Sequence, residues 1–385
     1  MKKFLLPIFV FAFVIYKLSS PAGNTPFNYF TRLASAFLDG KYYLTEKPSW
    51  LSELIPSGDK YYVVYPPAPA ILLIPFVFVF GDNFPQQILA HLVGAGIILS
   101  TIKLALQVKK ANRLAVWSGI LAGFGSIVWY MSSAGSVWYL GQTVAALFLL
   151  LAINEALGKK RPILIGTLLS IAFFSRLNTI VTLIFYAYLL RKEVKKVKYV
   201  LLLIFPIAMS SVLFGLYNYV RFGNPFENGY FLLPEILNET GAPWFVKGVM
   251  SPYYIFDNVK AALWSFPKLL DHLPFIQPSW SGLAIWITTP AFIYALGGSK
   301  PKKLIRITKA TIILSFLVIA MHGGTGFAQF GYRFAVDFYP LLIFLTIRNI
   351  AKTNIHWHHW LLLGLSILVN AWGVIWINKL GWVSF

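Results

Sequence analysis

The stretch YYVVYPPAPAILLIPFVFVFG, residues 61–81, is strongly apolar, yet it carries Pro66, Pro67, Pro69 and Pro75. A helix that crosses a ~30 Å hydrocarbon core needs roughly 20 apolar residues, and runs of about 10–14 are more often buried or re-entrant. Proline removes a backbone donor, so the carbonyl groups it frees need protein or a water-filled cavity around them. We therefore expect residues 61–81 to enter the membrane and return, or to lie along its interface.

The composition of the whole chain points to a membrane protein. Of its 385 residues, 58% are hydrophobic and 12% are charged, and the mean hydropathy is +0.68. Soluble domains carry about 25% charged residues. The chain contains no cysteine, which excludes disulfide bonds, thiolate metal sites and a cysteine nucleophile. The sequence predicts an all-α integral membrane protein.

Apolar runs along the chain predict about eleven transmembrane helices. The first run follows Lys2 and Lys3, a pattern that also fits a cleaved signal peptide, and both interpretations stay open. The runs at 162–175 and 178–190 are short for full spans. The complete set is 4–19, 86–107, 114–131, 136–157, 162–175, 178–190, 199–220, 281–298, 307–322, 336–348 and 359–378.

The charges set the expected orientation. Lysine and arginine collect in short turns, such as VKKANR at 108–113 and RKEVKKVK at 191–198, and such turns mark the cytoplasmic side. Of the 13 acidic residues, only Glu155 and Glu193 fall on that side. We expect a multi-pass protein of the plasma membrane with a cytoplasmic N-terminus. The net charge of +20 is then spread over turns that meet anionic lipid, which excludes a nucleic-acid-binding groove.

Two long loops fall on the outer side, residues 20–85, which include the re-entrant segment, and residues 221–280. Both are rich in tryptophan, tyrosine and proline, and these aromatic residues favour the headgroup region. We expect amphipathic interfacial helices in them, such as FNYFTRLASAFLDG at 27–40 and YIFDNVKAALWSFPKLLDHL at 254–273. The whole chain, 1–385, is interpreted as a single integral-membrane domain without a separate soluble domain.

Several motifs, in this order along the chain, resemble the GT-C superfamily of polytopic glycosyltransferases. They are YPPAPA at 65–70, FFSRLNT at 173–179, LYNYVRFGNPFENGY at 216–230 and QFGYRFAVDFYPLL at 329–342. In that superfamily the first outer loop ends in a Pro-Pro motif. The chain is most similar to bacterial and archaeal members of the dolichyl-phosphate-mannose mannosyltransferase type. The resemblance implies transfer of a sugar from a polyprenyl (dolichyl or undecaprenyl) phosphate to a glycan, lipid or protein at the outer face.

Such a transfer needs a carboxylate that takes the proton of the acceptor hydroxyl. The resemblance implies an acid in the first outer loop, often early in it, but here no acid precedes Asp39. We predict Glu53 as the catalytic residue, because the apolar residues around it, including Trp50, favour an interfacial position where burial raises a carboxyl pKa. Asp39 and Asp59 are the alternatives. For each of the three, a solvated loop carboxylate is the competing interpretation.

The departing phosphate needs fixed cations. Arg176 lies between two short apolar runs, a costly position unless the arginine is paired or faces a water-filled cavity. Arg333 and Asp337 are four residues apart and would face each other on a helix, so a structural ion pair is the competing interpretation for them. The predicted substrate-binding residues are Lys60, Tyr65, Arg176, Arg221, Arg333 and Asp337.

The sequence leaves cofactors open. No cofactor is certain, and a divalent cation is used by some members of the superfamily and not by others. His356, His358 and His359 alternate with tryptophans at a span boundary, which favours an interfacial belt over a metal site. A lipid flippase or transporter, and a non-catalytic membrane assembly partner, are the alternative functions. A transporter is disfavoured because no internal repeat is visible and the interiors of the predicted spans carry no acid.

Overall fold

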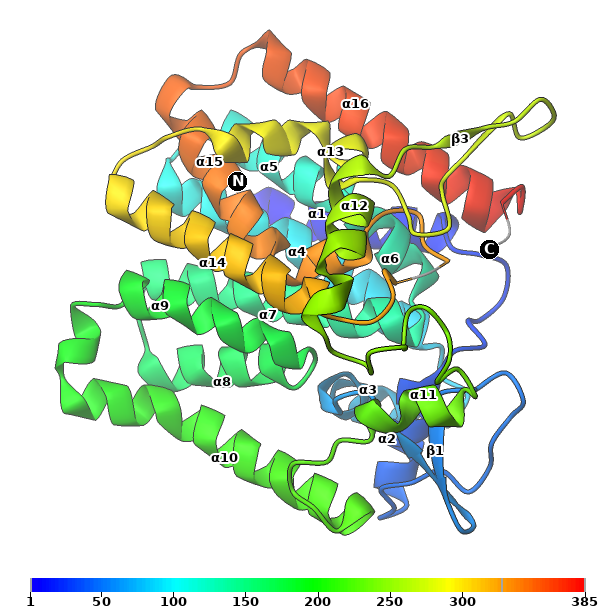
Figure 1. Ribbon diagram of the computed structural model, residues 1–385. Helices are drawn as coiled ribbons and strands as arrows, with labels where there is room; N and C mark the ends of the chain where they lie inside the picture. Colours follow the sequence, from blue (N-terminus) through cyan, green and yellow to red (C-terminus); the bar gives the residue numbers. More distant parts are fainter. Residues whose placement is uncertain (1, 327, 384–385) are drawn as a thin grey trace.

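The computed structural model describes residues 2–326 and 328–383, which fold mainly into α-helices (Figure 1). The helices are α1 (Leu5–Leu18), α2 (Tyr29–Leu38), α3 (Ala68–Phe80), α4 (Gln86–Val108), α5 (Asn112–Gly123), α6 (Val128–Ala134), α7 (Val137–Leu157), α8 (Pro162–Phe173), α9 (Leu183–Leu189), α10 (Val197–Phe222), α11 (Leu233–Ile236), α12 (Ile255–Trp264), α13 (Ile285–Thr288), α14 (Lys302–Ala320), α15 (Tyr339–Thr353) and α16 (Trp357–Gly373). Two antiparallel hairpins pair β1 (Leu54–Ser57) with β2 (Lys60–Val63), and β3 (Lys268–Leu269) with β4 (Ile276–Gln277).

Four of the described helices are long and apolar enough to cross a membrane: α4, α7, α10, and α16 with its continuation to Lys379. Helices α5 and α6 make a fifth if they are counted as one span bent by 53°. Helices α1, α3 and α8 and residues Leu177–Leu189 are apolar but shorter. The predicted helical membrane fold is therefore confirmed, with two short hairpins added to it, whereas the expected count of about eleven spans is not.

Breaks inside the predicted spans explain part of this difference. Residues 114–131 divide between α5 and α6, with Gly123 and Gly125 at the turn. Residues 281–298 form α13 and then the separate 3-10 helix Pro290–Leu296. A proline cannot donate the hydrogen bond that would continue the preceding helix, and 3-10 runs stay short. Apolar composition alone does not reveal where such breaks fall.

Residues 61–81 contain the end of β2 and one helix, α3, and form no re-entrant hairpin, while the alternative that the segment lies along the interface stays a prediction. Pro67 and Pro69 stand at the start of α3, where the missing N–H costs no helical bond, and Pro75 lies inside it. At 1.5 Å per residue the 13-residue α3 is ~20 Å long, which is short of a ~30 Å core. The helix packs against α2 and α7. The segment thus falls short of a span, but it does not turn back on itself.

The outer loops contain the first expected amphipathic helix in full and the second only in part. Helix α2 lies within 27–40 and buries residues that include Phe30 and Leu33 against α3. Helix α12 ends at Trp264, although the predicted helix continued to residue 273. Pro267 accounts for the difference, because helices usually end before the residue that precedes a proline. The residues beyond it form the β3–β4 hairpin.

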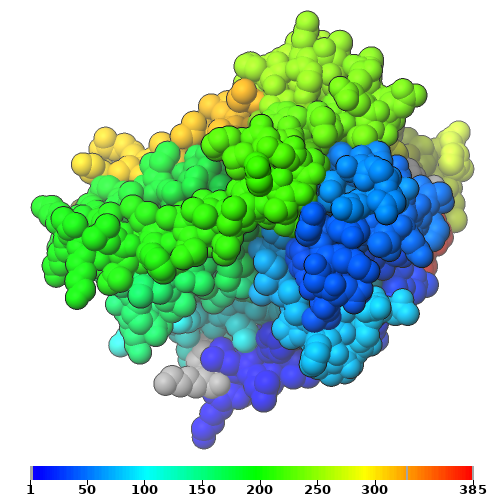
Figure 2. Space-filling view, turned by 90° about the horizontal axis from the view of Figure 1, so that it is seen from below, coloured from blue at the N-terminus to red at the C-terminus, as the bar shows by residue number. Residues whose placement is uncertain are grey.

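Helix α7 lies at the centre of the packed helices, while α10 lies at the edge (Figure 1). Helices α4, α8 and α15 pack around α7, which is buried along most of its length. Helix α10 packs mainly on α8 and exposes large apolar side chains over most of its surface, as a helix in lipid does. Figure 2 shows it, in green, lying across one face beside the blue first loop. The start of α7 carries Trp138 and Tyr139, two residues of the site described next.

Candidate functional site

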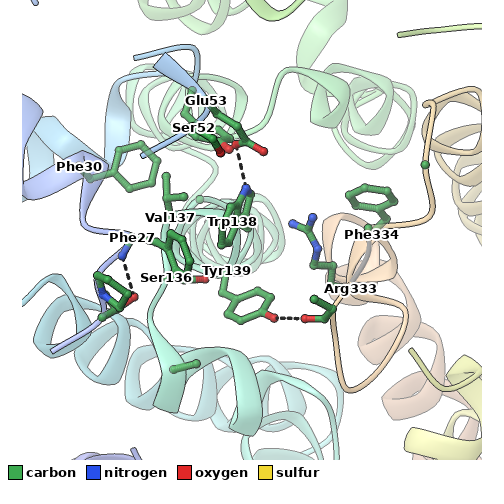
Figure 3. Close-up of a pocket in the computed structure, with 18 of the residues that line it drawn as sticks. Phe27, Phe30, Ser52, Glu53, Ser136, Val137, Trp138, Tyr139, Arg333 and Phe334 are labelled. Atoms are coloured by element: carbon green, nitrogen blue, oxygen red, sulfur yellow. Dashed lines mark hydrogen bonds between the residues drawn. The ribbon is translucent and has the colours of Figure 1, made fainter. Parts of the chain in front are cut away.

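A cavity of about 670 Å³ lies at the N-terminal end of α7 (Figure 3). It is lined by residues 21–30 and 52–66 of the first predicted outer loop, by residues 230–245 of the second, and by residues 322–326 and 328–334 before α15. Ligand pockets usually measure roughly 300–1,000 Å³ and combine apolar walls with a few convergent polar groups. The cavity brings residues from both outer loops together with the segment that contains Arg333.

The start of α7 is fixed by a tight turn. Gly135 ends α6 with a φ of +61°, in the left-handed region that side chains disfavour. A Cβ at this position would lie 2.7 Å from the Cα of Gln87, so only glycine fits. The side chain of Gln86 donates to the Gly135 carbonyl over 2.8 Å. This turn directs Trp138 and Tyr139 of α7 into the cavity.

Glu53 is held in the cavity wall by two contacts. The indole Nε1 of Trp138 donates to its Oε2 over 3.0 Å, and the Tyr29 hydroxyl accepts from its backbone N–H over 3.2 Å. The side chain is half-buried. Burial raises the pKa of Glu53 above its ordinary value, while the indole hydrogen bond and nearby Arg333 lower it. Glu53 is therefore an oriented carboxylate with strengthened basicity.

The guanidinium of Arg333 points into the same space as Glu53 and Trp138 (Figure 3). It lies over the ring of Phe334, 5.0 Å from the centroid, and 5.9 Å from that of Tyr139. Within residues 2–326 and 328–383, no carboxylate forms an ion pair with it. Burial lowers the pKa of Arg333, but a guanidinium stays charged at neutral pH. A half-buried cation of this kind attracts an anion.

Arg176 also lines the cavity, and it is paired with Asp337. Its Nη2 and Nε donate to Asp337 Oδ2 over 3.0 and 3.1 Å, and Asn178 donates to the same oxygen over 2.9 Å. The expected pairing of Arg333 with Asp337 is therefore wrong. Residues Arg333–Asp337 form a 3-10 helix, in which a spacing of three, not four, brings side chains onto one face.

A tyrosine–histidine pair that the sequence analysis did not select completes this wall. The ring Nε2 of His322 lies 2.9 Å from the Tyr230 hydroxyl, and its Nδ1 lies 3.4 Å from the Gly324 carbonyl. Burial, with Arg176 and Arg333 nearby, lowers the pKa of His322 to about 4, so the ring is neutral at pH 7. Nδ1 then carries the proton, and Nε2 accepts from Tyr230. The pair holds the Tyr230 oxygen in a fixed orientation.

A second carboxylate in the cavity comes from the second outer loop. Glu239 lines the cavity, and its Oε2 accepts from the indole Nε1 of Trp244 over 2.8 Å. Its charge raises the pKa of Glu53. Its place in the cavity was not predictable from the sequence, since it depends on how the loop folds over the cavity.

Five of the nine predicted site residues do not line the cavity. Asp39 is exposed and pairs with Lys41 over 3.6 Å, and Asp59 is exposed at the β1–β2 turn. Lys60 lies over the ring of Tyr43, 4.9 Å from its centroid. Arg221 is buried and donates to the Val63 carbonyl over 2.9 Å, which ties α10 to β2. The remaining predicted residues, Glu53, Tyr65, Arg176 and Arg333, line the cavity, and Asp337 lies behind Arg176.

A divalent cation would need several converging ligands. In the described part of the chain, no three histidine, aspartate or glutamate side chains are placed to hold a metal ion. Glu53 and Glu239 are the carboxylates that the cavity offers among these residues. His358 instead bonds through Nδ1 to the hydroxyl of Tyr294 over 2.6 Å. This donor set does not assemble a protein-built metal site, and metal dependence stays untested.

The sequence matches no protein-family model and no curated protein. The structure, however, resembles crystal structures of ArnT from Cupriavidus metallidurans. The apo structure matches with a TM-score of 0.54 and 12% identity, over 93% of this chain and 61% of that one. The structure bound to undecaprenyl phosphate matches with a TM-score of 0.56 and 13% identity, over 96% and 64%. The chain thus spans less than two thirds of the ArnT length. At these identities the likeness establishes the fold, so the chain has the fold of ArnT.

Proposed function

We propose that the chain is a membrane glycosyltransferase that moves a sugar from a polyprenyl-phosphate donor to a hydroxyl of a glycan, lipid or protein. One ArnT structure of the same fold is bound to undecaprenyl phosphate. The observation that carries the proposal is the cavity itself, where the carboxylate of Glu53 and the guanidinium of Arg333 face one space. An attacking hydroxyl needs the first of these charges and a departing phosphate needs the second.

In the proposed step, the acceptor oxygen attacks the anomeric carbon of the donor sugar, and the bond from that carbon to the phosphate oxygen breaks. Glu53 takes the hydroxyl proton, and the bonding electron pair leaves with the polyprenyl phosphate. A single displacement of this kind inverts the anomeric configuration. The raised pKa of Glu53 brings its basicity closer to that of an efficient general base near neutral pH.

The two arginines have different parts in this proposal. The guanidinium of Arg333 is free to bind two phosphate oxygens in a bidentate way. Arg176 is already bound to Asp337 and presents its remaining N–H groups to the cavity. His322 is neutral, so it adds no charge; it accepts a hydrogen bond from the Tyr230 hydroxyl and thereby fixes the position of the Tyr230 oxygen in the cavity wall. Two fixed cations would stabilise the phosphate as its charge develops.

The polyprenyl tail needs an apolar path from this site into lipid. One wall of the cavity is apolar and is formed by Phe30, Tyr65 and Pro66. Helix α3 starts two residues after Pro66. Helix α3 carries exposed large apolar side chains toward its C-terminal end, including Phe78 and Phe80. The opening stretch of residues 61–81 would thus connect the catalytic loop with the surface along which the tail lies.

The charge pattern supports a plasma-membrane protein with a cytoplasmic N-terminus and the cavity on the outer face. Because the chain has no cysteine, single cysteines can be introduced and labelled with a membrane-impermeant maleimide. We expect labelling from outside intact cells at Asp59→Cys and not at Lys110→Cys, both of which are exposed positions. Labelling of Lys110→Cys from outside would show that the protein has the opposite orientation.

The function is tested with purified protein in liposomes and a radiolabelled polyprenyl-phosphate sugar. Release of polyprenyl phosphate, with label appearing on an acceptor, supports the transferase. The Glu53→Gln variant should bind the donor but release nothing above background, while Asp39→Asn, an exposed carboxylate outside the cavity, should behave as wild type. Movement of intact donor between leaflets would identify a flippase. If the protein neither transfers the sugar nor moves the donor, the function of a non-catalytic assembly partner remains.

A further inference from the structure

The two hairpins of the outer loops differ sharply at their tips. The β1–β2 turn is polar, with Ser57, Gly58 and Asp59 exposed. The β3–β4 hairpin ends instead in large apolar side chains, with Leu269, Leu273 and Phe275 exposed by 81%, 55% and 59%. Solvent-exposed apolar side chains gathered on one projection mark an interaction surface. The two hairpins therefore meet different surroundings.

The apolar side chains stand on a hairpin whose shape is fixed. Within it, Leu270 N–H donates to the Phe275 carbonyl over 2.8 Å, and Phe275 N–H donates to the His272 carbonyl over 2.7 Å. At its base, Ala284 N–H donates to the Ser265 carbonyl over 2.9 Å. The tip is thus held out by backbone bonds, and its exposure is a property of the fold.

The hairpin projects at the level of a membrane-spanning helix. In Figure 1 it lies beside the C-terminal end of α16 and extends sideways, whereas β1–β2 lies beyond the end of α10. Helix α16 exposes Leu361, Leu365 and Leu368 to its surroundings, and α13 packs against it. The half-exposed ring of Trp286 in α13 packs against the ring of Phe266 at the base of the hairpin, with 5.7 Å between the ring centroids. Exposed apolar side chains thus extend from α13, which packs on α16, to the base of the hairpin.

We infer that the β3–β4 hairpin is a membrane anchor, whose tip enters the headgroup–acyl boundary of the leaflet on the cavity side. Its position beside α16, a helix long and apolar enough to cross a membrane, favours lipid over a protein partner. Asp271 and His272, with side chains exposed by 97% and 71%, share the tip. These polar groups fit the boundary, where interfacial segments bury their apolar side ~5–10 Å deep, and they exclude the hydrocarbon centre.

The anchor is linked to the cavity through the backbone. The carbonyl of Trp280, just after the hairpin, accepts from Ala328 N–H over 3.0 Å, and Leu283 N–H donates to the Phe330 carbonyl over 2.9 Å. Both partners belong to the segment that leads to Arg333. A lipid-bound hairpin would hold this segment at a constant height above the bilayer.

The test uses the cysteine-free chain and needs no substrate, so it is independent of the proposed transfer. Leu273→Cys carries an environment-sensitive fluorophore, and the protein is placed in nanodiscs of phosphatidylcholine and phosphatidylglycerol. Spin-labelled lipids then quench the fluorophore according to depth. Asp59→Cys, at the polar tip of the other hairpin, is the matched control. Leu269→Cys is a second labelling position if Leu273→Cys does not fold.

We expect a blue-shifted emission at Leu273→Cys and a loss of fluorescence that is larger with spin labels near the top of the acyl chain than with labels at its end. Asp59→Cys should show neither effect. If the fluorophores at Leu273→Cys and Leu269→Cys are as water-exposed and as unquenched as the one at Asp59→Cys, the hairpin does not contact lipid and the inference is overturned.

Discussion

The hydrogen bond from Trp138 to Glu53 predicts a specific effect on the pH dependence of activity. The indole Nε1 lies 3.0 Å from Glu53 Oε2 and can only donate, so it stabilises the charged carboxylate over the neutral acid. This contact lowers the pKa of Glu53 against the raising effect of burial. The Trp138→Phe substitution keeps a ring but removes the donor. The pKa of Glu53 should therefore rise further.

The size of this shift follows from the strength of the bond. Hydrogen bonds to charged groups contribute about 1.5–3 kcal/mol, and one pKa unit corresponds to about 1.36 kcal/mol, which sets an upper range of roughly one to two units. Glu53 is half-buried, so water replaces part of the lost bond and the lower end applies. We expect a rise of about one unit. Since the proposed base acts in its charged form, activity at acidic pH falls.

The assay is kcat/KM for sugar transfer in liposomes as a function of pH, because this profile reports groups of the free enzyme. The acidic limb of Trp138→Phe should move to higher pH by about one unit. Trp129→Phe is the matched control, since its indole donates to the Ser19 hydroxyl and not to a carboxylate. If folded Trp138→Phe shows an acidic limb that coincides with that of wild type, Glu53 is not the titrating base.

Three further predictions concern single contacts in the cavity. Glu53→Gln should lower kcat by roughly 100- to 10,000-fold while donor binding persists, and full activity would remove Glu53 from the mechanism. Arg333→Gln should weaken binding of polyprenyl phosphate by roughly tenfold to 100-fold in a titration, because one charge-assisted contact is lost; unchanged affinity contradicts its phosphate role. Asp337→Asn should lower the free energy of unfolding by about 3 kcal/mol, because Arg176 then lacks its buried partner; an unchanged melting temperature contradicts this.

The membrane class and the helical fold were predictable from the sequence because they depend on composition and local patterns. The amphipathic helix at 27–40 and the extent of α4, α7 and α10 follow from runs of residues within one element. The bent pair of α5 and α6 and the single helix α3 were not predictable in the same way. They depend on which distant helices pack against them, and one sequence does not carry that information.

In the candidate site, too, the features that depend on local sequence were predictable and those that depend on distant residues were not. Glu53 was selected from its local apolar context, and the structure places it in the cavity, while its catalytic role stays a prediction. The pairing of Arg176 with Asp337 joins residues 161 positions apart, so local spacing favoured the wrong partner for Asp337. Arg221 carries a guanidinium group that could bind phosphate, but this group donates to the Val63 carbonyl and ties α10 to β2. A site role for His322 was not predictable, because an isolated histidine in a glycine-rich segment has no distinguishing local signal.

The proposed transfer requires that one cavity holds the donor phosphate and the base together. A structure of the reconstituted protein with a bound polyprenyl-phosphate sugar would show whether it does. We predict phosphate oxygens within hydrogen-bond distance of the Arg333 guanidinium, and the anomeric carbon inside the cavity on the side of Glu53. Density for the phosphate at the basic turns of residues 108–113 or 191–198, with the cavity left to water, would contradict it.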